Sequence, residues 1–162
     1  MTAYLKNELT DQEILMSILS NHATSSVVRV EGEIDINDLN RGDYSGEEVA
    51  KRMERASVLA QVDIHRAATH NKGVMNGIHA VVLATGNDTR GAEASAHAYA
   101  ARDGQYRGIA TWKYDEARGR LVGTIEVPMT LAIVGGGTKV LPIAKASLDL
   151  LNVESARELG HV

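Results

Sequence analysis

The 162-residue sequence contains neither phenylalanine nor cysteine, and this double absence limits the kind of core that it can build. Aromatic residues make up only 4% of the chain, whereas hydrophobic residues as a whole make up 44%. The core must therefore consist of aliphatic side chains and of closely packed alanine and glycine. Without cysteine, the chain forms no disulfide, offers no thiolate nucleophile and cannot bind zinc through sulfur.

Length and charge indicate one ordinary globular domain with a sizeable core. Charged residues make up 23% of the chain, the net charge is −4, and no block of basic residues offers a surface for nucleic acid. The longest apolar run, Ala80 to Thr85, is too short for a bilayer, which needs about 20 residues. The N-terminus lacks the apolar stretch of a signal peptide. We therefore expect a cytoplasmic protein with no membrane or nucleic-acid partner.

The hydrophobic pattern of the first half predicts a strand, a loop and a helix. Apolar residues alternate within 25–36, which predicts a strand. Residues 37–46 are rich in Asn, Asp and Gly and predict a loop. Ser45 is placed to cap a helix that runs to about Gln61. The residues at helical spacing that we expect to face the core are Val49, Met53, Ala56 and Ala60.

The second half predicts more helices and a hairpin. Residues 76–85 are almost wholly apolar and form a buried helix or a buried strand, which periodicity does not decide. The alanine-rich segment 91–102 predicts a helix. Segments 106–113 and 120–127 read as two strands of a hairpin. A last clear helix opens at Pro142 and ends near Asn152.

Both ends of the chain carry capping-box patterns. Thr10–Glu13 predicts the start of a helix, although Ser17–Ser20 would suit a short strand equally well. Ser155–Glu158 announces another helix, but Val162 follows within about one turn, and an isolated helix that short gains too little to form. We interpret the C-terminal sequence as truncated.

The densest cluster of polar and structure-breaking residues lies at 63–77, just before the apolar segment. It combines two Gly, two Asn, two His, a Lys, an Arg and an Asp. Such a cluster predicts a loop, and loops on rigid scaffolds often carry functional sites. The alternative is a solvated connection whose Asn and Gly serve turn geometry.

Two shorter motifs are compatible with either structure or function. Gly86–Arg90 reads as a capping turn with Asp88 or Thr89 at the N-cap, or as a carboxylate placed near Lys72. The glycine run 134–138 matches neither the dinucleotide-binding nor the P-loop pattern, which favours a tight turn. The six histidines lack metal-ligand spacing, and no serine nucleophile elbow occurs, so we expect neither a metal site nor a serine triad.

Residues 66–78 read Arg-Ala-Ala-Thr-His-Asn-Lys-Gly-Val-Met-Asn-Gly-Ile, and here the sequence resembles class II (bacterial-type) 3-hydroxy-3-methylglutaryl-coenzyme A (HMG-CoA) reductase. The resemblance continues through 84–88, 96–100 and 134–142, with 18–21 fitting upstream, and so covers essentially the whole chain. It implies an α+β fold: the substrate-binding core of the reductase with an edge of its small cofactor-binding domain.

The resemblance implies two domain assignments and a reaction. Residues 1–24 would be a remnant of the small NAD(P)-binding domain, with a strand near 14–20, and 25–162 would be the substrate-binding domain, truncated at its C-terminus. The family is an oxidoreductase of the mevalonate pathway to isoprenoids. It reduces HMG-CoA to mevalonate and CoA with two hydrides from NADH or NADPH, and its enzymes are dimers with active sites at the subunit interface. A homodimer or larger assembly is therefore expected.

The resemblance also assigns the candidate site residues. Lys72 matches the catalytic lysine and Asp88 the catalytic aspartate, and we expect their side chains to lie within hydrogen-bond reach. Asn76 matches the asparagine that orients the lysine, and Arg66 an arginine that binds the free carboxylate of the substrate. Residues matching regions near the cofactor and substrate are Asn21, Val134, Gly135 and Gly136.

Three departures from the family pattern bear on activity. His79 stands where the family usually has an acid, and Thr89 where it usually has tryptophan. The chain also lacks the family's catalytic glutamate, its cofactor loop and its C-terminal histidine, and His161 lies too soon after the helix at Pro142 to be that histidine. We therefore expect the isolated chain to be inactive. The alternatives are a non-catalytic remnant or CoA-binding module, and a split-enzyme subunit that needs a partner polypeptide.

Overall fold

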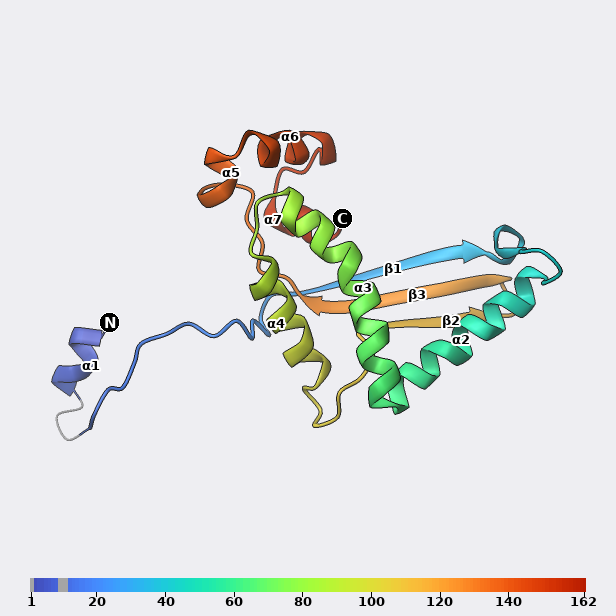
Figure 1. Ribbon diagram of the computed structural model, residues 1–162, viewed down its shortest axis with the longest axis horizontal. Coiled ribbons are helices and arrows are strands. Elements are labelled where there is room, and N and C mark those ends of the chain that lie inside the picture. Colours follow the sequence, from blue (N-terminus) through green and yellow to red (C-terminus); the bar gives the residue numbers. More distant parts are fainter. Residues whose placement is uncertain (1, 9–11) are drawn as a thin grey trace.

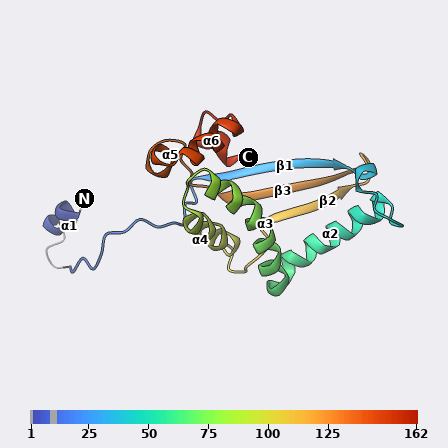
Figure 2. The same ribbon diagram turned by 45° about the horizontal axis from the view of Figure 1, so that its top comes forward.

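The computed structural model describes residues 2–8 and 12–162 (Figure 1). Helices lie on one side of a small antiparallel sheet, in line with the expected α+β class (Figures 1 and 2). The elements in chain order are α1 (Thr2–Glu8), β1 (Val27–Asp35), the 3-10 helix η1 (Ile36–Leu39), α2 (Gly46–Val62), α3 (Ile64–Ala84), α4 (Thr89–Ala100), β2 (Ala110–Asp115), β3 (Arg120–Pro128), α5 (Gly136–Val140), α6 (Pro142–Leu151) and α7 (Ala156–Gly160).

The sheet has the order β1-β3-β2, and its two faces differ in chemistry. On the face toward the helices, β3 contributes the buried residues Leu121 and Val127. The opposite face carries charged cross-strand pairs, because side chains alternate between the faces of a strand. There Asp35 lies opposite Arg120, with 3.5 Å between their charged atoms. This polar face needs no covering layer.

The core is built from small residues, as the composition predicts. Fully buried alanines are present in α2, α3, α4 and α6, and they allow close approach of the backbones. They are Ala50, Ala60, Ala67, Ala96 and Ala144. The largest buried side chain in the centre is Met75 of α3, which packs against Ile109, Val127 and the alanines of α4. Flexible methionine takes the place that phenylalanine often fills elsewhere.

Helix α2 begins as predicted, but its buried face differs from the expected one. Ser45 and Glu48 form both hydrogen bonds of a capping box. Ala60 is buried, whereas Ala56 is exposed, so its expected place in the core is wrong. Its neighbour Ser57 is buried instead, and its hydroxyl accepts a hydrogen bond from Trp112 N at 2.8 Å. Because Ser57 is polar, the spacing of apolar residues does not identify it as part of the buried face of the helix.

The predicted loop at 63–77 is wrong, because this segment forms the first two thirds of the long helix α3. The apolar segment 76–85, for which helix and strand were both open, continues the same helix. Two polar residues in the first part of α3, His70 and Asn71, make hydrogen bonds to the backbone that leads into β2. These long-range bonds outweigh the weak helix propensity of Asn, Thr and Gly.

The hairpin and the last long helix confirm their predictions, with shifted strand boundaries. Strand β2 spans Ala110–Asp115 rather than 106–113, and β3 ends at Pro128 rather than at 127. Residues 107–109 pair instead with helical groups: Gly108 N donates to Ala60 O at 3.0 Å, and Asn71 bonds to the backbone on either side of Gly108. Helix α6 begins at Pro142 and ends before Asn152, which adopts the left-handed conformation. The alanine-rich helix forms as α4.

Both ends of the chain differ from expectation. Residues 12–20 form neither the predicted helix nor the strand, and Thr10 and Asp11 of the capping box lie outside the described residues. This arm extends away from the sheet (Figure 1), and Leu19 in it is 94% exposed, so no neighbouring strand pairs with it. At the other end the one-turn helix α7 does form, because Ser155 caps it and Leu159 is buried in the body.

Within residues 2–8 and 12–162, no helix is long and apolar enough to cross a membrane.

Candidate functional site

Lys72 and Asn76 lie one turn apart on the solvent-exposed face of α3. With its amide oxygen toward the ammonium group, Asn76 accepts a hydrogen bond from Lys72 Nζ at 3.3 Å, and its nitrogen donates to Lys72 O at 3.2 Å. Gly73 and Gly77 flank the pair, and a Cβ at either would meet nothing within 4 Å. The Lys72 ammonium group is therefore oriented by Asn76 on an open surface that the flanking glycines leave free of side chains.

A half-buried and a buried neighbour, His70 and Asn71, hold this part of α3 in place. Asn71 is 0% exposed; its amide nitrogen donates to Arg107 O at 2.8 Å, and its oxygen accepts from Ile109 N at 2.9 Å. The His70 ring bonds to Ala110 O at 3.1 Å, and burial lowers the pKa of His70. Sequence reasoning gave these residues no role, although an Asn-Lys step inside a helix places one side chain inward and the next outward.

Arg66 lies in the first turn of α3, on the same helix as Lys72. Its backbone N–H donates to Asp63 Oδ1 at 2.9 Å, which caps the helix. Its guanidinium makes no hydrogen bond or ion pair with any residue that the structure describes. A half-buried guanidinium of this kind has its donors available for a carboxylate.

Asp88 caps the next helix, α4. Its Oδ1 accepts a hydrogen bond from Gly91 N at 3.0 Å, so the capping interpretation of this turn is confirmed. A Cβ at Gly91 would lie 2.8 Å from Asp88 Oδ2 and 3.3 Å from Asn21 Oδ1. Asn21 and Asp88 therefore flank the same glycine, and the glycine keeps the space between them free.

The glycine run lies against the turn that carries Asp88. The Asn87 amide pairs with both backbone groups of Ala132, at 3.0 and 2.8 Å. Gly86 has a φ of 70°, and a Cβ at Gly137 would lie 2.8 Å from Gly86 O, so the two backbones are in direct contact. Close approach of this kind requires glycine on both sides. Asn21, Asp88 and the glycine run thus gather at one end of the molecule.

A pocket of about 560 Å³ opens beside the glycine run. Val134 and Gly135 line it together with the charged side chains of Lys145 and Asp149. Gly135 and Gly136 both have positive φ, so the expected tight turn is present and leads directly into the short helix α5.

Lys72 and Asp88 do not meet within one chain. Residues 72 to 84 of α3 separate them by about 18 Å of helix, and a lysine side chain reaches only roughly 6 Å. Among the residues that the structure describes, no hydrogen bond or ion pair joins the two. The expected contact is therefore wrong for a single chain, because the predicted loop between them is a rigid helix.

A second polar cluster joins α3 to α4. Glu93 lies between His79, at 3.9 Å, and His97, at 3.6 Å. The Nδ1 atom of His97 bonds to the Tyr106 hydroxyl at 2.7 Å. The buried Nε2 of His79 has no hydrogen-bond partner among the residues that the structure describes. In the described ranges 2–8 and 12–162, no group of three or more such side chains is arranged to hold a metal ion.

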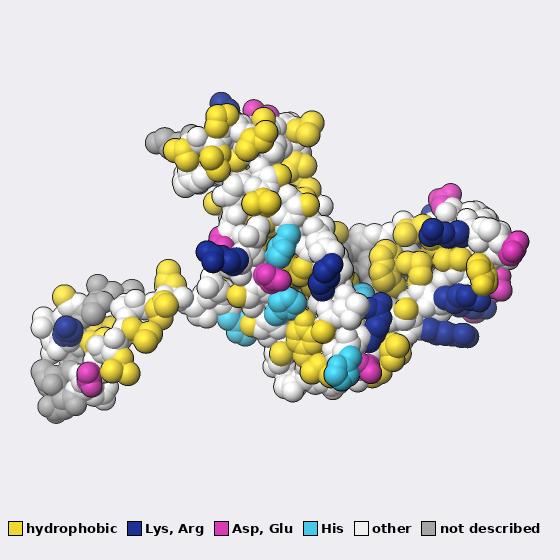
Figure 3. Space-filling view, in the orientation of Figure 1, with side chains coloured by type: hydrophobic (Ala, Val, Ile, Leu, Met, Phe, Trp, Pro, Cys, Tyr) yellow, Lys and Arg dark blue, Asp and Glu magenta, His cyan; other side chains and the backbone are white. Residues whose placement is uncertain are grey.

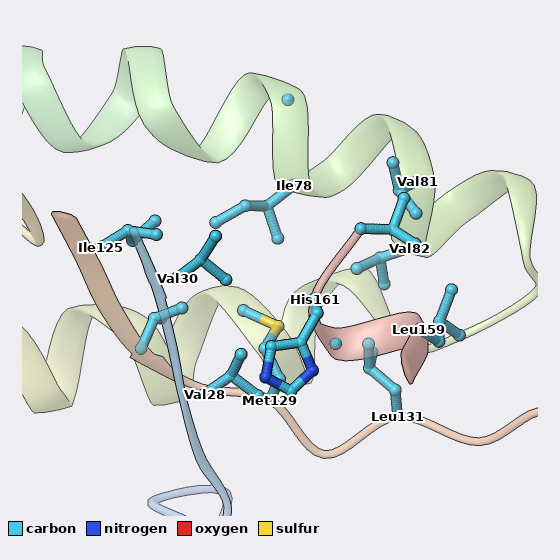
Figure 4. Close-up of a pocket in the computed structure, with 14 residues that line it drawn as sticks. Val28, Val30, Ile78, Val81, Val82, Ile125, Met129, Leu131, Leu159 and His161 are labelled. Atoms are coloured by element: carbon cyan, nitrogen blue, oxygen red, sulfur yellow. The ribbon is translucent and has the colours of Figure 1, made fainter. Parts of the chain in front are cut away.

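A largely apolar cavity lies beside α3, and Gly77 is the one residue next to the Lys72–Asn76 pair among those that line it. It has a volume of about 190 Å³ and lies between the sheet, α3 and the C-terminal residues (Figure 4). Val30, Ile78 and Leu159 are among its lining side chains, and His161 points toward Met129 at its edge (Figure 4). None of the predicted site residues lines it.

Comparison with known proteins gives consistent matches over the chain. The family model described as hydroxymethylglutaryl-coenzyme A reductase matches residues 1–162. The 3-hydroxy-3-methylglutaryl-coenzyme A reductase of Archaeoglobus fulgidus is 44% identical over 95% of this chain, and a probable reductase of Borreliella burgdorferi is 34% identical over 90%. The chain spans about a third of the length of these relatives, 34% and 33% respectively.

Solved structures of reductases with this description also match nearly the whole chain. A 3-hydroxy-3-methylglutaryl-coenzyme A reductase from Streptococcus pneumoniae is 46% identical, with a TM-score of 0.89 over 98% of this chain and 37% of that one. The class II reductase of the same organism, solved with NADPH bound in open conformations, gives a TM-score of 0.90 and covers 98% of this chain and 38% of that one.

Proposed function

Because this chain belongs to the hydroxymethylglutaryl-coenzyme A reductase family, we propose that it forms part of an enzyme that reduces HMG-CoA to mevalonate and CoA with NADH or NADPH. The observation that carries the proposal is the position of Asn76 one turn from Lys72 on the open face of α3, where its amide oxygen, turned toward the ammonium group, accepts from Lys72 Nζ. The chain's own matching residues then have defined tasks in thioester reduction.

The nicotinamide cofactor, when bound, supplies the hydride; the chain supplies charge and position. Hydride addition to a thioester carbonyl builds negative charge on its oxygen, and an oriented ammonium group stabilises that charge. Asn76 keeps the Lys72 ammonium in place from one turn away. We assign Arg66 to the free carboxylate of the substrate, because a guanidinium fork matches that group in two hydrogen bonds.

The separation of Lys72 from Asp88 leads us to propose a composite site. In a two-fold dimer, Lys72 of one copy and Asp88 of the other would face one substrate, where the carboxylate would hold the ammonium and tune its proton affinity. Asn21 and the run Val134–Gly136 would then reach this site from the copy that supplies Asp88, since they gather near it. We propose that Asn21 and Val134–Gly136 lie on the cofactor side of the shared site.

We also propose a division of the chain between two domains. Residues 25–162, which contain the sheet and its helices, would be the substrate-binding part. Residues 1–24 would belong with the cofactor-binding part, because Leu15, Ile18 and Leu19 in the described arm are more than three quarters exposed. Apolar side chains in such a position require a covering surface.

Oxidation of NADH or NADPH with HMG-CoA tests the activity. The chain is assayed alone and grafted in place of the matching segment of the Streptococcus pneumoniae reductase, each with a Lys72→Ala control. Activity of the graft that is lost in the control supports the proposal. Full activity of the graft that carries Lys72→Ala would contradict it. Binding of HMG-CoA by the chain without turnover identifies a subunit or binding module that needs a partner polypeptide.

Mixing two inactive variants tests the composite site. In a mixed dimer of Lys72→Ala with Asp88→Ala, one site carries both changes and the other carries neither. An equal mixture of the two in the graft should therefore recover about a quarter of the original activity. Recovery of none would place Lys72 and Asp88 in one site of a single chain and contradict the proposal.

A further inference from the structure

We propose that Asn87 is a positioning residue for the reduction, because it fixes the glycine run relative to the Asp88 carboxylate. This inference rests on the proposed function, in which Asp88 faces the substrate and the run lies on the cofactor side. Three consecutive residues of one turn make the connection. Gly86 contacts the backbone of Gly137, Asn87 bonds to Ala132, and Asp88 caps α4. The run is therefore held on both sides by residues that directly precede the carboxylate.

The Asn87 side chain pairs with Ala132 as a neighbouring strand would. Its Nδ2 donates to Ala132 O at 3.0 Å, and its Oδ1 accepts from Ala132 N at 2.8 Å. Among residues 2–8 and 12–162, no backbone group bonds to either of these Ala132 atoms. A side-chain amide carries a donor and an acceptor side by side, so it satisfies both backbone groups at once. The bridge joins residues that lie 45 positions apart in the sequence.

A buried hydroxyl orients the Asn87 amide. Thr85 is 0% exposed; its Oγ1 accepts a hydrogen bond from Asn87 Nδ2 at 3.0 Å and donates one to Val81 O at 2.8 Å. The two hydrogens of the amide nitrogen are thus used, one toward Thr85 and one toward Ala132. A turned amide would lose all three of its bonds, so the side chain keeps one orientation. The end of α3 is in this way connected to the run.

The elements that follow the run give it no such polar attachment on the surface in view. Over α5 and α6 this surface carries mainly hydrophobic side chains (Figure 3), and Val140 and Ile143 are among the exposed ones. Apolar side chains form no directional bonds, so they do not set a distance to the turn. The run itself contains Gly135 and Gly136, and glycine has the most freely rotating backbone. The position of the run therefore depends on Asn87.

NADPH binding and turnover by the Streptococcus pneumoniae graft test this role. Asn87→Ala removes both bonds to Ala132 and should raise the dissociation constant for NADPH, followed by its fluorescence, about tenfold. The KM for HMG-CoA should stay unchanged, because Arg66 and Lys72 lie on α3. Ser57→Ala is the matched control: it removes a side-chain bond to β2 and should change neither constant. An unchanged NADPH constant in Asn87→Ala, or equal changes in both variants, would overturn the proposal.

Asn87→Asp separates hydrogen bonding from side-chain size. The introduced carboxyl has the shape of the amide, but its ionised form places an acceptor against Ala132 O. At neutral pH, NADPH should therefore bind more weakly to Asn87→Asp than to Asn87→Ala. The difference should shrink as the pH falls toward about 5, because the carboxyl takes up a proton and regains a donor. Equal or tighter binding by Asn87→Asp at neutral pH would contradict the proposal.

Hydrogen exchange separates this inference from the proposed function. In the chain alone, the Ala132 N–H should exchange faster in Asn87→Ala than in the original sequence, because its acceptor is lost. The exchange is measured by NMR without substrate or cofactor. Unchanged exchange at Ala132 would overturn the link whatever the graft does. Faster exchange, combined with a graft that binds NADPH but does not reduce HMG-CoA, would retain the link and contradict only the proposed function.

Discussion

The Asn71→Ala substitution should destabilise the fold strongly, although it removes only a small polar group. Asn71 is 0% exposed and bonds to Arg107 O and Ile109 N. Its loss leaves the buried Ile109 N–H and the partly buried Arg107 carbonyl without partners, each worth about 1–3 kcal/mol. We therefore expect the free energy of unfolding to fall by about 2–6 kcal/mol.

Urea denaturation followed by circular dichroism measures this loss. With a slope of about 2 kcal/mol per molar urea, the midpoint should move by roughly 1–3 M. Asn76→Ala is the matched control, because Asn76 is exposed on the same helix and its loss should change stability by only about 0.5 kcal/mol or less. A loss below about 1 kcal/mol in Asn71→Ala would refute the argument that this side chain fixes α3 to the strand connection.

Three further predictions concern single side chains. Burial lowers the pKa of His70, so the folded state favours the neutral ring. Stability should therefore fall as the pH drops through 6.5. Urea midpoints measured at acid and at neutral pH should show a smaller fall in His70→Gln than in the original chain. The hydrogen bond to Glu126 and burial raise the pKa of Tyr99, so the folded state favours the neutral phenol. Stability should therefore be lost as the pH rises above 10.0, the ordinary pKa, and through the higher pKa of the folded state. A pH series of unfolding midpoints should show less of this loss in Tyr99→Phe. Asp88→Ala should cost about 1 kcal/mol through loss of the cap, whereas Asp88→Asn should keep the cap and stability in thermal unfolding but weaken dimers measured by sedimentation.

The parts of the fold that sequence predicts well are those decided by neighbours in the chain. The capping box of Ser45 and Glu48, the proline that opens α6 and the left-handed Asn152 act within a few residues, so their patterns are sufficient. The segment 63–77 is different. Its helix depends on hydrogen bonds from His70 and Asn71 to residues that lie 36 to 40 positions later in the sequence, and no local pattern reveals such bonds.

The candidate site divides in the same way. Motif resemblance identified Lys72, Asn76 and Asp88, and the structure brings Asn76 to Lys72 because they are one helical turn apart. The separation of Asp88 followed from the length of α3, which the predicted loop concealed. His79, Glu93 and His97 had no pattern of their own, since their proximity depends on how α3 and α4 pack.

The contact between Gly86 and Gly137 makes two distant parts of the sequence behave as one mechanical unit. No side chain lies between the turn that carries Asp88 and the glycine run, so neither can yield by changing a rotamer. The Asn87 side chain adds a second connection, through its two bonds to the backbone of Ala132. The turn that carries Asp88 and the glycine run beside the pocket are therefore joined rigidly at two points.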